Sequence, residues 1–237
     1  MAFRLRRRLF RINTPVPVVS FSFDDAPTTA FTSGSEILDR HSARATYFMS
    51  LGLLGSETEV GTIASAQDLR RAVEQGHELG CHTFDHLDAW YTPTQKFLDS
   101  IDRNSKALEE VLPGQTFRTF AYPKSGAKLS TKLPLESRFA CCRGGGQTAN
   151  TGVTDLNLLN AFFLNDRVKN ILDVQDVIDR NASSCGWLII ATHDVNDHPS
   201  PHGCTPQFFS AVVACAAQSG ALLLPIAKAF DKLNHLS

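Results

Sequence analysis

The sequence lacks the features that mark a membrane protein or a disulfide-linked scaffold. Its 237 residues contain no apolar run of about 18 residues, so we expect no transmembrane helix. The basic N-terminus is followed by no apolar stretch, which argues against a secretory signal. The six cysteines form no CxxC pair, and the adjacent Cys141 and Cys142 could pair with each other only under strain. We therefore expect most of them to be buried, unpaired thiols and the protein to be cytoplasmic.

The chain also lacks a large excess of charge of either sign. Its formal net charge is -1, so no overall field favours an anionic membrane, and we expect no nucleic-acid partner. No internal repeat, low-complexity tract or linker divides it. Hydrophobic residues make up 43% and charged residues 20%, and the length suits one large α/β domain. We expect residues 1–15 to be a basic, solvated N-terminal extension and residues 16–237 to form one domain.

The predicted elements alternate between strand and helix. Strands are predicted over residues 16–23, 45–49, 78–81, 116–122, 139–142, 187–192 and 221–224, with helices over 33–41, 65–75, 94–112, 172–183, 205–219 and a short one ending at 233. The continuous apolar run at 187–192 is typical of a parallel strand that is covered on both faces. Strand-helix units of this length predict parallel strands in a barrel or an open sheet, where sites lie at the carboxyl ends of strands.

Residues suited to metal binding and proton transfer follow three of these predicted strands. Asp24 and Asp25 end the first strand, His82 and His86 follow the strand at 78–81, and His193 follows the apolar strand. Two histidines four residues apart share one face of a helical turn, and with one of the aspartates they would hold a divalent metal and leave a coordination position open. The other carboxylate is available as a base, and His193 as the acid that protonates a leaving amine or alcohol. The pattern predicts a metal-dependent hydrolase.

In this order the motifs resemble those of the polysaccharide deacetylase family (carbohydrate esterase family four). The resemblance extends from about residue 16 to residue 233 and is carried by SFDDAP (22–27), HTFDH (82–86), FAYPKSG (120–126) and IIATHD (189–194). It implies a deformed (β/α) barrel of about seven parallel strands, with residues 16–237 as a single catalytic domain. It also implies hydrolysis of the carbon–nitrogen bond of an N-acetyl group on a sugar or polysaccharide.

The resemblance assigns a role to each of these residues. It implies Asp24 as the base, Asp25, His82 and His86 as the metal ligands, and His193 as the general acid. Zinc is the expected metal, with Co²⁺, Ni²⁺ and Mn²⁺ as alternatives. The expected substrate is an N-acetylated carbohydrate or a related small molecule.

The third motif departs from the family pattern. The resemblance places Tyr122 and Lys124 among the oxyanion or substrate contacts, Lys124 through its main-chain N–H. An arginine that orients the base in many relatives is Ala121 here, and we expect Arg167 to replace it. The other candidates for this substitution are Arg118 and Arg143. In the first motif the usual glycine is Ala26, where a positive φ would be strained.

Two other functions are open at this point. The same centre could hydrolyse a non-sugar C–N bond or an O-acetyl ester, or the chain could be a metal- or glycan-binding module that has lost catalysis. The presence of both Asp24 and His193 argues against a pure binding module, which needs neither base nor acid. His198 and His202, on the polar loop after the acid, are candidates for substrate contact. The sequence indicates neither the exact substrate nor the oligomeric state.

Overall fold

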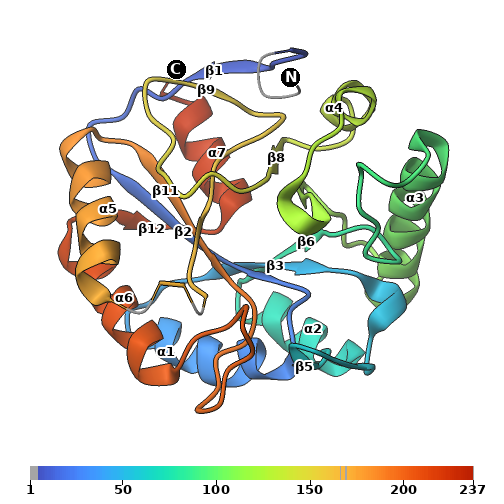
Figure 1. Cartoon of the computed structure of the whole chain (residues 1–237), viewed down its shortest axis with the longest axis horizontal. Coiled ribbons are helices and arrows are strands. Elements are labelled where there is room, and N and C mark those ends of the chain that lie inside the picture. The colour runs from blue at the N-terminus through green and yellow to red at the C-terminus, as the bar shows by residue number, and fades with distance from the viewer. Residues whose placement is uncertain (1–4, 166, 169, 237) are drawn as a thin grey trace.

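The computed structural model describes residues 5–165, 167–168 and 170–236, and its centre is a sheet of parallel strands with helices around it (Figure 1). The strands of this sheet are β2 (Val18–Asp24), β3 (Ala45–Met49), β6 (Glu78–Cys81), β7 (Thr119–Ala121), β8 (Cys141–Arg143), β10 (Phe162–Phe163), β11 (Trp187–Thr192) and β12 (Leu222–Leu223). The α-helices are α1 (Ser35–Asp39), α2 (Ala66–Glu74), α3 (Thr94–Val111), α4 (Leu129–Glu136), α5 (Ile171–Ser183), α6 (Pro206–Gln218) and α7 (Ile226–Asn234).

The order of the strands gives the sheet its barrel form. Seven strands follow one another as β10-β11-β2-β3-β6-β7-β8, and β12 pairs with the first two residues of β2. The segment that leads into β10 connects the two edges, because Leu159 forms a parallel bridge with Arg143 and Phe162 pairs with Ile190. The sheet therefore curls into a deformed (β/α) barrel, which confirms the predicted fold class.

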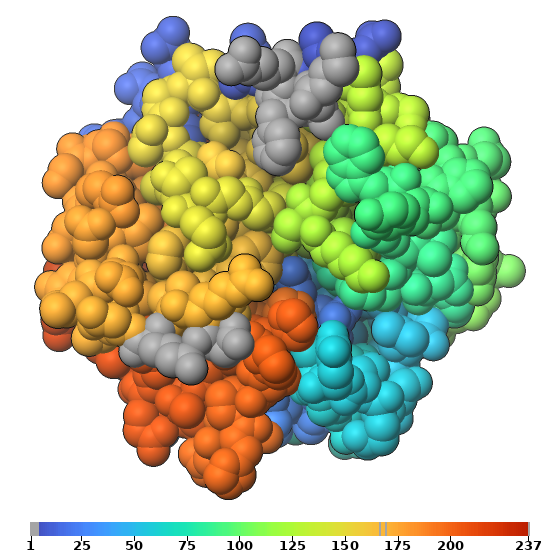
Figure 2. Space-filling view, in the orientation of Figure 1, coloured from blue at the N-terminus to red at the C-terminus, as the bar shows by residue number. Residues whose placement is uncertain are grey.

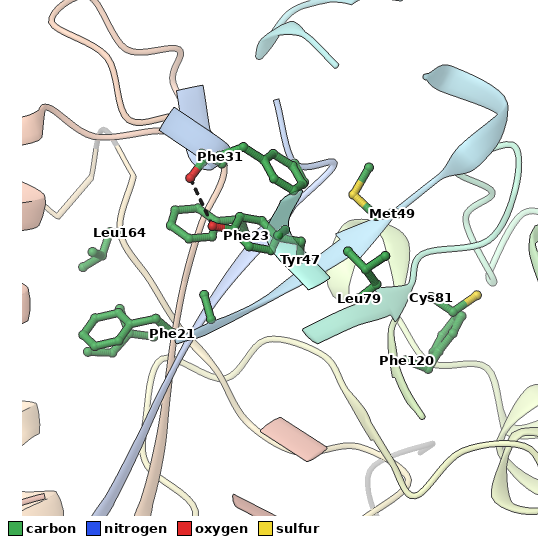
Figure 3. Packing of buried hydrophobic residues seen from close by; sticks show 14 of the residues in the cluster. Phe21, Phe23, Phe31, Tyr47, Met49, Leu79, Cys81, Phe120 and Leu164 are labelled. Atoms are coloured by element: carbon green, nitrogen blue, oxygen red, sulfur yellow. Dashed lines mark hydrogen bonds between the residues drawn. The ribbon is translucent and has the colours of Figure 1, made fainter. Parts of the chain in front are cut away.

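Side chains alternate between two faces along each strand, and each face has its own core. The outer face packs against the helices; Phe21 and Phe23 of β2 both contact Phe209 of α6. Figure 3 shows this layer, in which Phe31 and Phe23 stack on the Tyr47 ring. The inner face fills the barrel with a second cluster of side chains, which includes Phe48, Ala121, Cys141, Trp187 and Ile189.

The amino ends of the strands are closed by α7. Ile226, Ala229 and Leu233 of this helix belong to the inner cluster. The half-buried Glu78 carboxylate accepts hydrogen bonds from the Ala227 N–H and from threonine hydroxyls of β3 and β7. With this end closed, the carboxyl ends of the strands are the open end of the barrel.

The segment before β2 packs against the barrel. Leu9–Arg11 form β1, which pairs antiparallel with β9 (Val153–Asp155). The Arg8 guanidinium donates hydrogen bonds to the carbonyls of Phe139 and Ala140. The expectation of a solvated tail is therefore wrong for this part of the segment, because its main chain and one of its arginines find partners on the domain. Residues 1–4 of the predicted extension lie outside the described residues.

Two expectations from composition can be compared directly with the structure. All six cysteines are unpaired, and Cys81, Cys141, Cys142 and Cys204 are buried, as expected. Burial raises the pKa of the Cys81 thiol to about 12, so this thiol is inert at neutral pH. Over the residues that the structure describes, none of the helices has the length and apolar character needed to cross a membrane.

Candidate metal and catalytic site

A cavity of about 760 Å³ opens at the carboxyl ends of the strands. Figure 2 shows it as a hollow in the middle of this face, with the blue of the β2 region at its floor. Its walls include all five residues of the predicted metal and acid–base site, namely Asp24, Asp25, His82, His86 and His193. Sequence segments that are more than a hundred residues apart therefore meet at one place, as the strand-end placement predicted.

The alternation along the strands brings Asp24 into the cavity, and a turn brings Asp25. Asp24 ends β2 on the inner face, on the same side as Ser20 and Ser22. Asp25 would point outward in a continued strand, but its φ is 55° and that of Ala26 is 46°. The positive φ that the sequence suggested for Ala26 is thus present, and this backbone conformation is strained for a residue with a Cβ. The strained turn places two adjacent carboxylates at one site.

Asp25, His82 and His86 form the only group of potential metal ligands found among the described residues. Their ligand atoms all lie within 4.8 Å of one another. The Asp25 Oδ1 atom lies 3.4 Å from Nε2 of His86 and 3.9 Å from Nε2 of His82. The segment between the two histidines is not the helical turn we expected; positive φ angles at Thr83 and His86 turn the chain instead.

The three side chains fit a divalent cation. The Asp25 Oδ1 atom is buried and has no hydrogen-bond partner, which is costly unless a cation satisfies it. The His82 Nδ1–H donates to the Ala121 carbonyl over 2.8 Å, so Nε2 carries the lone pair on the side of Asp25. Burial lowers the pKa of His82 well below its usual range, so the ring is neutral, as a metal ligand must be.

Asp24 forms a buried ion pair with Arg143 of β8. The guanidinium of Arg143 contacts the Asp24 carboxylate, and the arginine side chain is 1% exposed. It also lies over the Phe48 ring, 4.7 Å from the ring centre. Burial lowers the pKa of Arg143 to about 9, because the charged form loses hydration, but this still leaves it protonated at neutral pH. Asp24 is therefore held as a carboxylate in a fixed position.

The expectation that Arg167 contacts Asp24 is wrong. Arg167 is exposed and lies on the wall of the cavity, and Arg143 occupies the place on Asp24. The reason is the strand register, in which Ala121 of β7 and Arg143 of β8 are direct partners on the inner face. The Cα atoms of these two positions lie side by side on neighbouring strands, so an arginine at either position enters the barrel at the same height.

His193 follows β11, on the inner face of that strand's continuation. Its Nδ1–H donates to the His202 carbonyl over 3.2 Å, which leaves Nε2 for the cavity. Burial lowers the pKa of His193 to about 4, while the charge of Asp25 acts in the opposite direction. The imidazole is therefore neutral at neutral pH and must take up a proton in the complex with substrate before it can act as an acid.

The third motif contributes Lys124 and Ser125 to the lining of the cavity, and its tyrosine is not among the lining residues. The Tyr122 ring is fully buried and packs edge-on against Phe120, and the Tyr122 N–H donates to the Arg143 carbonyl over 3.0 Å. The prediction that Tyr122 contacts the oxyanion or substrate is therefore wrong. Lys124 and Ser125 both line the cavity and have φ angles of 58° and 60°. The residue for which an oxyanion role of the main-chain N–H is predicted therefore lies at the cavity wall.

Two side chains on opposite loops meet across the mouth of the cavity. Glu59 lies on the hairpin of β4 (Glu57–Thr58) and β5 (Gly61–Thr62), and its Oε1 atom is 3.4 Å from Nε2 of His202. Both residues line the cavity, whereas His198 is not among its lining residues. Sequence reasoning missed Glu59, because one acidic residue in a two-stranded hairpin carries no periodic or motif signal.

The fold and the site together define the class of protein as a (β/α)-barrel hydrolase. A family model described as polysaccharide deacetylase matches residues 11–136 of the chain. A chitin deacetylase from Colletotrichum lindemuthianum is 31% identical over 202 residues, which cover 81% of this chain and 75% of that protein. The chain belongs to the polysaccharide deacetylase family, whose members are hydrolases that remove acetyl groups.

Other relatives are similar over less of their length or only in fold. The peptidoglycan-N-acetylglucosamine deacetylase PgdA of Listeria monocytogenes is 32% identical over 91 residues, which make up 38% of this chain and 18% of PgdA. The chain thus matches less than a fifth of that relative. The structure of a family 4 acetyl xylan esterase from Clostridium thermocellum, in complex with a cobalt ion, superposes with a TM-score of 0.60 at 19% identity and covers 91% of both chains. At this identity the likeness concerns the fold alone.

Proposed function

We propose that this protein is a metal-dependent deacetylase that removes N-acetyl groups from a sugar or polysaccharide. The observation that carries the proposal is the buried Asp25 Oδ1 atom, which lacks a hydrogen-bond partner and faces the Nε2 atoms of His82 and His86. Asp25, His82 and His86 would hold the cation, and zinc is the metal we expect, with Co²⁺, Ni²⁺ or Mn²⁺ as alternatives. The names of two relatives, a chitin deacetylase and a peptidoglycan-N-acetylglucosamine deacetylase, support a sugar-linked acetamide as substrate.

The chemistry is divided between the cation and four residues of this chain. A bound divalent ion lowers the pKa of its water to about 7 and polarises a carbonyl. Asp24, held as a carboxylate by Arg143, takes a proton from the attacking water. The Lys124 N–H donates to the acetyl oxygen as negative charge develops there. His193, once protonated in the substrate complex, passes its proton from Nε2 to the departing amine.

Acetate release from acetylated chitooligosaccharides tests the proposal. We expect release by the full chain with zinc, and loss of release when a chelator removes the metal. The Asp24→Asn variant should retain zinc and lose turnover by a factor of about 10² or more, because it lacks the base. Asp197→Asn, an exposed aspartate on the loop after the acid, is the matched control and should retain turnover. Full activity of Asp24→Asn would remove Asp24 as the base.

Other outcomes of the same assay identify the rival functions. Acetate release from acetylated xylan but from no chitooligosaccharide would favour an O-acetyl esterase. Zinc binding without release from any acetylated substrate would favour a non-sugar C–N bond or a binding module. The six unpaired thiols support the cytoplasm as the proposed compartment.

A further inference from the structure

The loop that leads from His86 to α3 presents two aromatic side chains to solvent. Trp90 is 54% exposed and Tyr91 is 90% exposed. Within the part of the chain that the structure describes, they are the only aromatic residues among the exposed large hydrophobic side chains. Adjacent exposed aromatic side chains are a feature of ligand-binding surfaces, and this loop tip differs in this respect from the rest of the described surface.

The conformation of the loop tip is held by hydrogen bonds and by a buried anchor. The Asp88 side chain accepts a hydrogen bond from the Trp90 N–H over 2.8 Å, and the Asp88 carbonyl accepts one from the Thr92 N–H over 3.1 Å. Between these residues Ala89 is fully buried. The Lys128 ammonium donates to the Thr92 carbonyl over 3.4 Å. The main chain that carries the two rings is therefore held in place before a ligand arrives, which reduces the entropy lost on binding.

This loop tip packs beside the wall of the cavity that holds the candidate metal site. Trp90 packs directly on Gly126, where a Cβ atom would lie only 2.5 Å from Cδ1 of the Trp90 ring. Gly126 follows Ser125, which lines the cavity, and His86, four residues before Trp90, lines it too. The Trp90 ring thus lies against the chain that forms one side of the cavity, and only glycine at position 126 allows this contact.

We propose that Trp90 and Tyr91 form a platform for a sugar ring next to the one whose acetyl group is removed. The inference rests on the proposed function, because that function supplies a glycan to the cavity. A pyranose ring has faces of C–H groups and an edge of hydroxyl groups. Its C–H face packs on the electron-rich face of an aromatic ring, while its hydroxyls stay in water. The substrate is then a chain of at least two sugar units, and its neighbouring unit contributes to binding without contacting the metal.

Binding of tetra-N-acetylchitotetraose to the full chain with zinc tests the platform. The Asp24→Asn form is used for calorimetry, so that the sugar is not consumed. We expect Trp90→Ala and Tyr91→Ala each to weaken binding by about 2- to 10-fold. Leu172→Ala is the matched control, because Leu172 is a 64% exposed apolar residue on α5, and its affinity should equal that of the parent. In acetate release by the chain with Asp24 intact, the loss should be in KM rather than in kcat.

Each outcome decides either the platform or the proposed function. Equal affinity in the parent, Trp90→Ala and Tyr91→Ala overturns the platform, and so does an absence of binding to the parent. A fall in kcat together with a lower melting temperature in the Trp90 variant would show a purely structural role and would also overturn it. Binding that depends on Trp90, without acetate release by the chain with Asp24 intact, supports the platform and contradicts the deacetylase proposal.

Discussion

The ion pair between Arg143 and Asp24 leads to a prediction in which an arginine is moved from one strand to the next. In the Arg143→Ala variant, Asp24 remains buried at 4% exposure without its cation. Breaking a buried pair in this way costs about 3–5 kcal/mol of stability. Burial then favours the protonated carboxyl over the carboxylate, so we expect a loss of about 10²-fold in kcat/KM at neutral pH and an acidic limb of the pH profile that moves to higher pH.

The second substitution restores the arginine from the neighbouring strand. Ala121 is the direct partner of Arg143 in the β7–β8 pair, and both residues are buried on the inner face. In Ala121→Arg/Arg143→Ala the new side chain enters the space that the old one leaves, so the total volume is conserved. We expect the double variant to recover most of the lost stability and activity. Ala121→Arg alone is the control for crowding and should destabilise by about 1–3 kcal/mol.

Urea denaturation and the pH dependence of acetate release together measure this prediction. If Arg143→Ala keeps its activity and its acidic limb, then Arg143 does not hold Asp24 as a carboxylate, and the reasoning fails. If the double variant regains stability but none of the activity, the position of the arginine matters beyond its charge. In that case an arginine on β7 is no substitute for one on β8, which would refute the equivalence of the two positions.

Two further predictions concern the metal and a buried histidine. Zinc at 100 times its dissociation constant should stabilise the fold by about 2.7 kcal/mol. We expect a higher melting temperature in the parent protein with zinc and no shift in the His86→Ala variant. Equal shifts of the melting temperature in both proteins would contradict the three-ligand site. Burial lowers the pKa of His77 to about 4, and the ring accepts a hydrogen bond from the Ala45 N–H. In the unfolded chain His77 binds a proton below about pH 6.5, whereas the folded ring stays neutral down to about pH 4. The contribution of His77 to the free energy of unfolding is therefore complete above pH 6.5 and falls by about 3 kcal/mol on acidification to pH 4. The difference in urea midpoint between the parent and His77→Asn should follow this window, and a constant difference would refute the assignment.

The long elements of the fold could be predicted because burial leaves a clear pattern. The apolar run at 187–192 is β11 with the predicted bounds, since a parallel strand covered on both faces needs apolar residues throughout. The predicted helix at 94–112 is α3, which ends at Val111. The short elements were missed. β1, β9 and β10 have two or three residues each, which is too few for a period, and α4 contains Pro134, a residue that normally argues against a helix.

The N-terminal segment shows why a charged stretch can mislead. By composition it reads as a solvated basic tail. In the structure, Arg8 donates to carbonyl groups about 130 positions further along the chain, and the Arg8 N–H donates to Asp155. A sequence pattern shows that a side chain is charged, but only the fold shows whether main-chain carbonyls converge to receive it.

The sequence by itself determined which residues could do the chemistry. Asp24, Asp25, His82, His86 and His193 each lie at a strand end within a local motif, and parallel strands bring such ends together whatever their separation along the chain. Only the tertiary structure decided which arginine holds Asp24 and on which face Tyr122 lies. Those outcomes depend on the register between neighbouring strands, because a shift of one residue moves each side chain to the opposite face of the sheet. No local sequence pattern records that register.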